Sequence, residues 1–150
     1  IVEKMIFVKF GSYQFTSVLI DGQFPNYRRV IPESQLYNFQ VEKADLQNAL
    51  KRVGLLVDKK IQRIYLEIKS GTLTISSQET EIGIAKEEIP CRYDGEEITI
   101  AVSFIHIEEP LRVMNTERLN FEFSGEMKAI TLRSEPAEDY FHIIMPMQME

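Results

Sequence analysis

The chain has 150 residues, which is about the length of one domain. An apolar fraction of 44% is enough for a packed core, and a formal net charge of −6 excludes a protein that coats nucleic acid through overall basicity. One cysteine and two histidines exclude a disulfide framework and a zinc finger, and no apolar run is long enough to cross a bilayer.

The first predicted element is a β-hairpin. Residues 5–10 and 13–20 are dense in aromatic and β-branched side chains and flank a Gly-Ser turn. Residues 24–32 follow as an extended connector, because their two prolines fix φ and remove hydrogen-bond donors. We place a domain boundary at its end, between residues 1–32 and 33–150. The chain opens inside strand-like sequence, with neither an initiator Met nor a secretory signal, so we expect a fragment of a longer protein.

The sequence period then changes from strand to helix. Residues 36–41 alternate as a short strand. The next segment has apolar residues at i, i+3 and i+4, which predicts an amphipathic helix of about four turns that ends near Asp58. Its apolar stripe consists of Leu46, Ala49, Leu50, Val53 and either Leu56 or Val57.

Strands and a second helix fill the rest of the chain. The predicted strands are residues 61–69, 72–76, 81–89 and 98–102, followed by a helix over 103–113 and strands at 119–123, 128–132 and 140–145. Ser103 can cap the second helix, whereas Pro110 inside it should kink its axis. From residue 36 on, the order is strand, helix, four strands, helix, three strands. This order predicts an α+β domain with a largely antiparallel sheet and two adjacent helices on one face.

No set of catalytic groups converges in the sequence. Cys91 with His106 or His142 would make a thiolate–imidazole pair, but a lone cysteine at a strand end is more often a small buried residue. Adjacent acids such as Glu87 and Glu88 point to opposite faces of a strand. Phosphate-binding loops, nucleophile elbows and metalloprotease motifs do not occur. We therefore expect no enzyme, no metal and no cofactor, and a small enzyme built on Cys91 remains one alternative.

Two segments carry a resemblance to a known family. They are DGQFPNYRRVIP at residues 21–32 and HIIMPMQ at residues 142–148. Together they resemble the bacterial sliding clamp, the β subunit of DNA polymerase III, in which a DG-x-FP-x-YRR-V-x-P connector joins the second domain to the third and the chain ends in an MPM strand. The resemblance covers the whole chain. It implies that residues 1–32 are the last hairpin and connector of the second clamp domain and that residues 33–150 are the third domain.

The resemblance implies a DNA-clamp fold and a topological function. Family clamps are head-to-tail homodimers that close a ring around duplex DNA, with helices lining the inside and sheets forming the outside. The ring tethers the polymerase and catalyses nothing, although it belongs to the polymerase holoenzyme. The implied partners are non-specifically encircled DNA, and the polymerase and clamp-loader subunits, which bind through short linear peptides. The implied location is cytoplasmic, with no membrane contact and no cofactor.

The resemblance also implies a DNA-facing set of basic side chains. Lys43, Lys51 and Arg52 on the first helix and Arg112 on the second would face the duplex, and Arg52 matches an arginine of the family helix. Lys and Arg attract phosphates without sequence choice through counterion release, while the overall acidity limits non-specific coating. An ordinary solvated helix face explains any one of the lysines equally well.

A partner-peptide groove is the second implied site. Residues of the connector and of the terminal strand match groove positions of the family: Pro25, Val30, Ile143 and Met145, with Pro146 and Met147 beside them. Methionine suits such a groove because it repacks around different partners. Simple core packing between the connector and the last strand is the alternative. Two departures from the family pattern are His106, where a groove-lining aromatic is usual, and Gln148, where a basic residue is common.

Two consecutive leucines end the first predicted helix. Leu55 and Leu56 point about 100° apart on a helix, so burial of both within one domain is unfavourable. The family places this position in the dimer interface, and we expect at least one of the two to be exposed and the chain alone to be unable to close a ring. A stand-alone α+β domain that binds one protein partner, without a role on DNA, is the other alternative.

Overall fold

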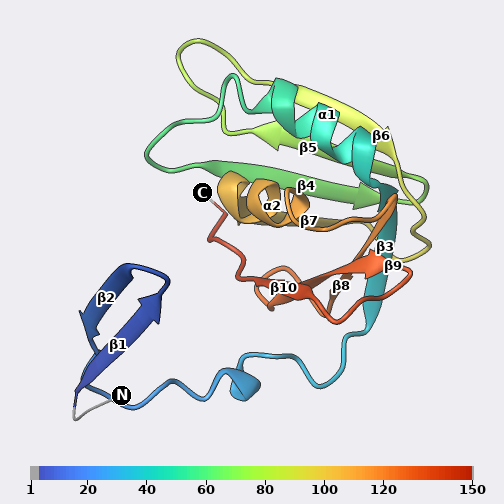
Figure 1. Cartoon of the computed structure of the whole chain (residues 1–150). Helices are drawn as coiled ribbons and strands as arrows, with labels where there is room; N and C mark the ends of the chain where they lie inside the picture. The colour runs from blue at the N-terminus through green and yellow to red at the C-terminus, as the bar shows by residue number, and fades with distance from the viewer. Residues whose placement is uncertain (1–3, 150) are drawn as a thin grey trace.

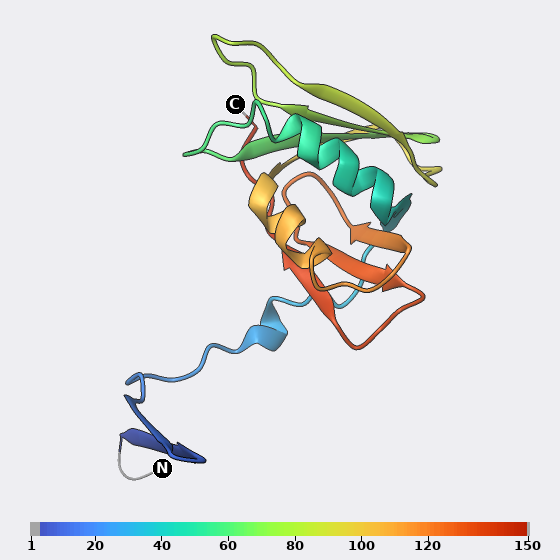
Figure 2. The same ribbon diagram turned by 45° about the horizontal axis from the view of Figure 1, so that its top comes forward.

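The computed structural model describes residues 4–149, which begin with a separate hairpin. Strands β1 (Met5–Phe10) and β2 (Tyr13–Val18) pair antiparallel, which confirms the predicted hairpin. The connector that follows has one short 3-10 turn, Tyr27–Arg29, and is otherwise without regular structure. Figures 1 and 2 both show the hairpin lying apart from the rest of the chain at the end of this connector.

The main domain has the predicted order of elements. It consists of β3 (Tyr37–Glu42), α1 (Lys43–Val53), β4 (Arg63–Lys69), β5 (Thr72–Ser77), β6 (Lys86–Pro90), β7 (Ile98–Ser103), α2 (Phe104–Leu111), β8 (Arg118–Phe123), β9 (Ile130–Glu135) and β10 (Phe141–Ile144). All strand pairs are antiparallel. They form two four-stranded sheets, β10-β9-β8-β3 and β6-β5-β4-β7, where the sequence predicted one largely antiparallel sheet.

Backbone hydrogen bonds join the two sheets at both of their edges. Gln40 of β3 and Arg92, just beyond β6, exchange N–H···O bonds of 3.1 and 2.8 Å. At the other edge the N–H of Met147, beyond β10, donates to the carbonyl of Ala101 in β7 at 2.7 Å. The edge strands therefore leave fewer unpaired backbone groups than two separate sheets would.

Both helices lie across the two sheets. Helix α1 contacts β3 of the first sheet and β5 and β6 of the second, and α2 contacts β10 and β7. The helices also contact each other, and Figure 2 shows them side by side. Gly54 permits this approach, because a Cβ atom there would lie 2.8 Å from the ring of Phe104 at the start of α2. No helix within residues 4–149 has the length and apolar character needed to span a membrane.

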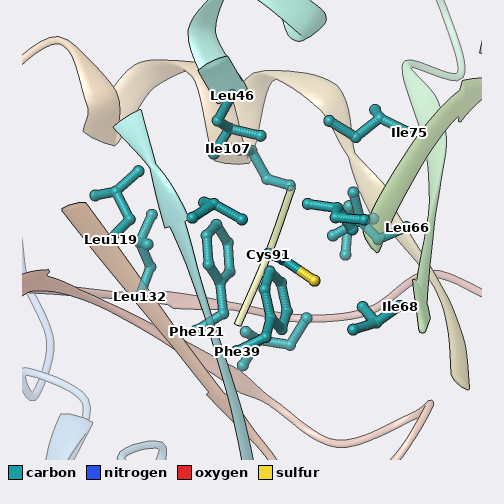
Figure 3. Packing of buried hydrophobic residues seen from close by; sticks show 14 of the residues in the cluster. Phe39, Leu46, Leu66, Ile68, Ile75, Cys91, Ile107, Leu119, Phe121 and Leu132 are labelled. Atoms are coloured by element: carbon teal, nitrogen blue, oxygen red, sulfur yellow. The ribbon is translucent and has the colours of Figure 1, made fainter. Parts of the chain in front are cut away.

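One hydrophobic core fills the space between the sheets and the helices (Figure 3). Phe39 of β3 stacks on Phe121 of β8, with ring centroids 4.6 Å apart and nearly parallel planes. Four members of the predicted apolar stripe are fully buried, which confirms the inward face of α1: Leu46, Ala49, Leu50 and Val53. Leu56 and Val57, the candidates for its fifth position, lie beyond the end of the helix and are half-buried. Burial of these side chains is the main source of the domain's stability.

The first helix is shorter than predicted. It ends at Val53, and residues 54–62 form turns instead of a fourth helical turn. The Asp58 carboxylate accepts hydrogen bonds from the backbone N–H groups of Lys60 and Ile61, both at 2.8 Å. Such a side-chain acceptor stabilises a turn in competition with the helix.

The strand predicted at residues 81–89 begins only at Lys86. Thr80 and Gly83 exchange backbone hydrogen bonds in a tight turn, and Gly83 has a φ of 123°. Ile82 and Ile84, whose alternation suggested inward positions, are therefore exposed. Ser103 occupies the predicted cap position of α2 without a side-chain cap bond, and Pro110 lies in its last turn.

Truncating Phe121 to alanine should cost about 3–5 kcal/mol of unfolding free energy, because the stack on Phe39 is lost and a cavity remains. Urea denaturation measures this change. Ile82→Ala is the matched control, since Ile82 is 78% exposed, and should change stability by no more than about 0.5 kcal/mol. Equal effects of the two substitutions would contradict this description of the core.

Candidate functional site

A hollow between the two helices gathers part of the predicted basic set. Its volume is about 520 Å³, and Lys51 of α1 and Arg112, directly after α2, both line it. Its lining also includes Leu50, Phe104, Glu108 and Leu111. The structure therefore brings Lys51 and Arg112 to one place, with apolar walls between the helices.

Three of the four predicted DNA-facing cations have partners within the chain. Arg52 donates from Nε and Nη2 to the two carboxylate oxygens of Glu87, both at 2.7 Å. Arg112 donates from Nη2 to Glu108 at 2.9 Å. Lys43 donates from Nζ to the carbonyl of Met114. Lys51 is exposed and forms no side-chain hydrogen bond or ion pair in the described part of the chain.

The fork between Arg52 and Glu87 is fully charged over the neutral pH range. The hydrogen bond from Arg52 lowers the pKa of Glu87, and the same bond raises the pKa of Arg52. Sequence reasoning missed Glu87 as a partner, because 35 positions separate it from Arg52 and only the packing of α1 on β6 joins them. The i, i+4 spacing of Glu108 and Arg112 is a signal that was readable from the sequence.

The terminal segment presents the predicted groove residues at the surface. Met145 is 56% exposed, and Ile143, Pro146 and Met147 are half-buried. The alternation of β10 directs Ile144 into the core and leaves Phe141 and Ile143 half-buried. The terminal segment is therefore anchored by Ile144 and by the bond from Met147 to the other sheet.

The connector does not close over this segment. Pro25 is exposed and Val30 is 52% exposed, and the backbone bonds of residues 25–30 are local to the 3-10 turn. Phe24 packs edge-to-face on Tyr27 within the connector itself. The structure thus brings together the terminal members of the predicted groove and leaves the two connector members in solvent.

The two leucines after α1 differ in exposure. Leu55 is 80% exposed and Leu56 is half-buried, which confirms that at least one is exposed. Both lie in the turn that follows Val53 and not on the helix. Leu55 also lines the hollow between the helices.

Cys91 is not placed for nucleophilic chemistry. Its side chain lies among the core residues in Figure 3, is 8% exposed, and directs its Sγ to the carbonyl of Lys69 at 3.7 Å. Burial raises the pKa of the Cys91 thiol, which disfavours the reactive thiolate. Within residues 4–149 no group of three or more His, Cys, Asp or Glu side chains is placed to hold a metal ion.

The two histidines lie where α2 contacts β10, close enough for their charges to interact. His106 is exposed on α2, and His142 is half-buried on β10. Burial lowers the pKa of His142 below its ordinary 6.5; the charge of His106 lowers it further, and Glu109 acts in the opposite direction. His142 is therefore neutral at pH 7.

Comparisons with known proteins agree on one family. The family model for the DNA polymerase III beta subunit, C-terminal domain, matches residues 28–148. The beta sliding clamp of Treponema pallidum is 51% identical over 100% of this chain and 42% of its own length, and that of Pseudomonas putida is 30% identical over 93% and 38%. The crystal structure of the DNA polymerase III subunit beta from Pseudomonas aeruginosa superposes with a TM-score of 0.90 at 28% identity, over 98% of this chain and 40% of that one. The chain thus spans less than half the length of the relatives it matches.

Native Cys91 should react with iodoacetamide at least about tenfold more slowly than Cys91 in the urea-unfolded chain. Burial blocks access of the reagent to Sγ and lowers the fraction of the thiol that is ionised to the reactive thiolate. Mass spectrometry of the alkylated chain measures the two rates at one pH. Similar rates would show an accessible thiol and would reopen the alternative of an enzyme built on Cys91.

Stability should fall as the pH is lowered from 6.5 through the depressed pKa of His142, because the unfolded chain takes up a proton that the folded chain refuses. His142→Gln should remove this fall in urea denaturation measured between pH 7.5 and 5. His106→Gln should only reduce it, since burial is the larger cause. Superimposable pH profiles of wild type and His142→Gln would contradict the assignment.

Proposed function

The chain belongs to the DNA polymerase III beta subunit family, and from this we propose that it is the C-terminal part of a sliding clamp that encircles duplex DNA as a dimeric ring. The complete clamp is a non-catalytic tether that keeps the DNA polymerase on its template. Residues 1–32 are the last hairpin and connector of the second clamp domain, and residues 33–150 are the third domain.

The observation that carries this proposal is the position of the helix pair. Both helices lie across two sheets that are joined at their edges, so the exposed helix side and the sheets are separate surfaces. Lys51 and Arg112 share the hollow between the helices, and Arg52, the residue after Lys51, is exposed and reaches Glu87 of β6. Lys43, also on α1, is the fourth cation of the set. These charges suit a weak contact with phosphates that does not depend on sequence.

The terminal segment supports a second role, the capture of partner peptides. Exposed Met145 beside half-buried Ile143, Pro146 and Met147 offers an apolar strip with adaptable methionines. Pro25 and Val30 match further groove positions of the family, but in this chain both are exposed and the connector does not cover the terminal strip. His106 on α2 is the remaining proposed member. The proposed occupant is an extended peptide from the polymerase or the clamp loader. An apolar groove with few polar groups can bind the apolar side chains of such a peptide.

The leucines after α1 support the dimer. An exposed Leu55 next to half-buried Leu56 is an apolar contact without cover in the described chain. Contiguous exposed apolar surface of this kind marks protein interfaces, whereas a single exposed leucine is common on any protein. The partner in this case is the first domain of a second copy of the full-length clamp.

Met145→Ala in the full-length clamp should weaken binding of a Gln-Leu-x-Leu-Phe peptide by about fivefold or more, because an anchor side chain of the groove is lost. Fluorescence anisotropy of a labelled peptide measures the affinity. Met127→Ala is the matched control, since Met127 is 53% exposed in the loop between β8 and β9. A peptide that binds both variants equally would overturn the groove and favour a domain with another kind of partner.

A further inference from the structure

The arginine with the strongest claim to face DNA is held by a carboxylate. The fork from Arg52 to Glu87 uses Nε and Nη2 and both carboxylate oxygens, at 2.7 Å each. It links helix α1 to strand β6 across 35 residues. Both partners still reach solvent, with side-chain exposures of 56% for Arg52 and 26% for Glu87.

A phosphodiester and this carboxylate compete for the same donors. The guanidinium fork fits the paired oxygens of a carboxylate or of a phosphate equally well. While Glu87 accepts from Nε and Nη2, these two donors cannot both serve a phosphate. An exposed ion pair favours its paired state by a factor of only roughly two to five in the equilibrium constant. A DNA phosphate can therefore displace the carboxylate, but its affinity for the arginine is reduced by that factor.

The second helix repeats the arrangement. Arg112 is paired with Glu108, one helical turn earlier, at 2.9 Å, and both line the hollow between the helices. Both arginines of the proposed DNA-facing set therefore carry an acidic partner. Lys51, which lines the same hollow, has none among the residues that the structure describes.

We propose that Glu87 and Glu108 are built-in competitors of the DNA backbone, which lower the affinity of the helix face for phosphates and keep the contact weak enough for sliding. This inference rests on the proposed function, because it requires that Arg52 and Arg112 face DNA. Each phosphate reached without competition would add to the affinity and to its dependence on salt. In this arrangement the arginines make the contact with the phosphates, and the glutamates limit its affinity.

The test compares two neighbouring glutamates of β6 in the full-length clamp. Glu87→Gln and Glu88→Gln each remove one negative charge, but successive residues of a strand point to opposite faces, and only Glu87 holds Arg52. Fluorescence anisotropy at low salt measures the affinity for a duplex oligonucleotide. We expect Glu87→Gln to bind about two- to fivefold more tightly than wild type and Glu88→Gln to differ by less than about 1.5-fold.

The arginine variant separates the two claims. Arg52→Ala should weaken binding, and in that background Glu87→Gln should behave like Glu88→Gln, because no guanidinium is left to release. If Arg52→Ala weakens binding but Glu87→Gln and Glu88→Gln are alike, the competitor role is wrong and the DNA-facing role stands. If Arg52→Ala leaves binding unchanged, the DNA-facing role of Arg52 fails together with the inference.

The second helix gives an independent comparison that does not involve β6. Glu108→Gln should bind DNA more tightly, by a similar factor, than Glu109→Gln, which removes the charge of the exposed neighbour that is not paired with Arg112. Thermal melting of all variants confirms that they are folded. Equal affinities of Glu108→Gln and Glu109→Gln would remove the competitor role from α2.

Discussion

The joining of the two sheets at both edges is the constraint on which the rest of the domain depends. Backbone bonds between Gln40 and Arg92 close one edge, and the bond from Met147 to Ala101 closes the other. The inner faces of eight strands then share one core, and each amphipathic helix must lie across both sheets to bury its apolar side. Of the cationic side chains, Lys51 and Arg112 then share the hollow between the helices, and Arg52 reaches Glu87 of β6.

The sequence predicted the features of the fold that depend on neighbouring residues along the chain. Alternation and helical spacing arise from burial on one face, so the order of all the elements in the main domain and the buried stripe of α1 followed from them. The division into two sheets did not follow, because it depends on pairings such as β3 with β8 across some eighty residues of chain. The end of α1 was missed because the turn at Asp58 competes with the helix.

The candidate sites show the same division between local and long-range information. Motifs in residues 21–32 and 142–148 pointed to the family. The prediction that at least one of Leu55 and Leu56 is exposed is confirmed, although both lie in a turn and not on the helix from which it was argued. Partners that depend on tertiary packing did not follow, and Glu87 on β6 is the clearest case. Positive charge on the helix side comes mainly from α1, since α2 itself carries Glu108 and Glu109 and only Arg112 follows it. Acidic partners neutralise both Arg52 and Arg112.

Photo-cross-linking tests most directly whether the helix side of this domain faces duplex DNA. A photoreactive side chain replaces either Lys51, on the exposed side of α1, or Glu67, which alternates with the buried Leu66 and Ile68 and so points away from the core of its sheet. The full-length clamp is loaded on circular DNA and illuminated. Covalent DNA adducts are expected from position 51 and none from position 67. Adducts from position 67 alone, or equal yields from both positions, would contradict it.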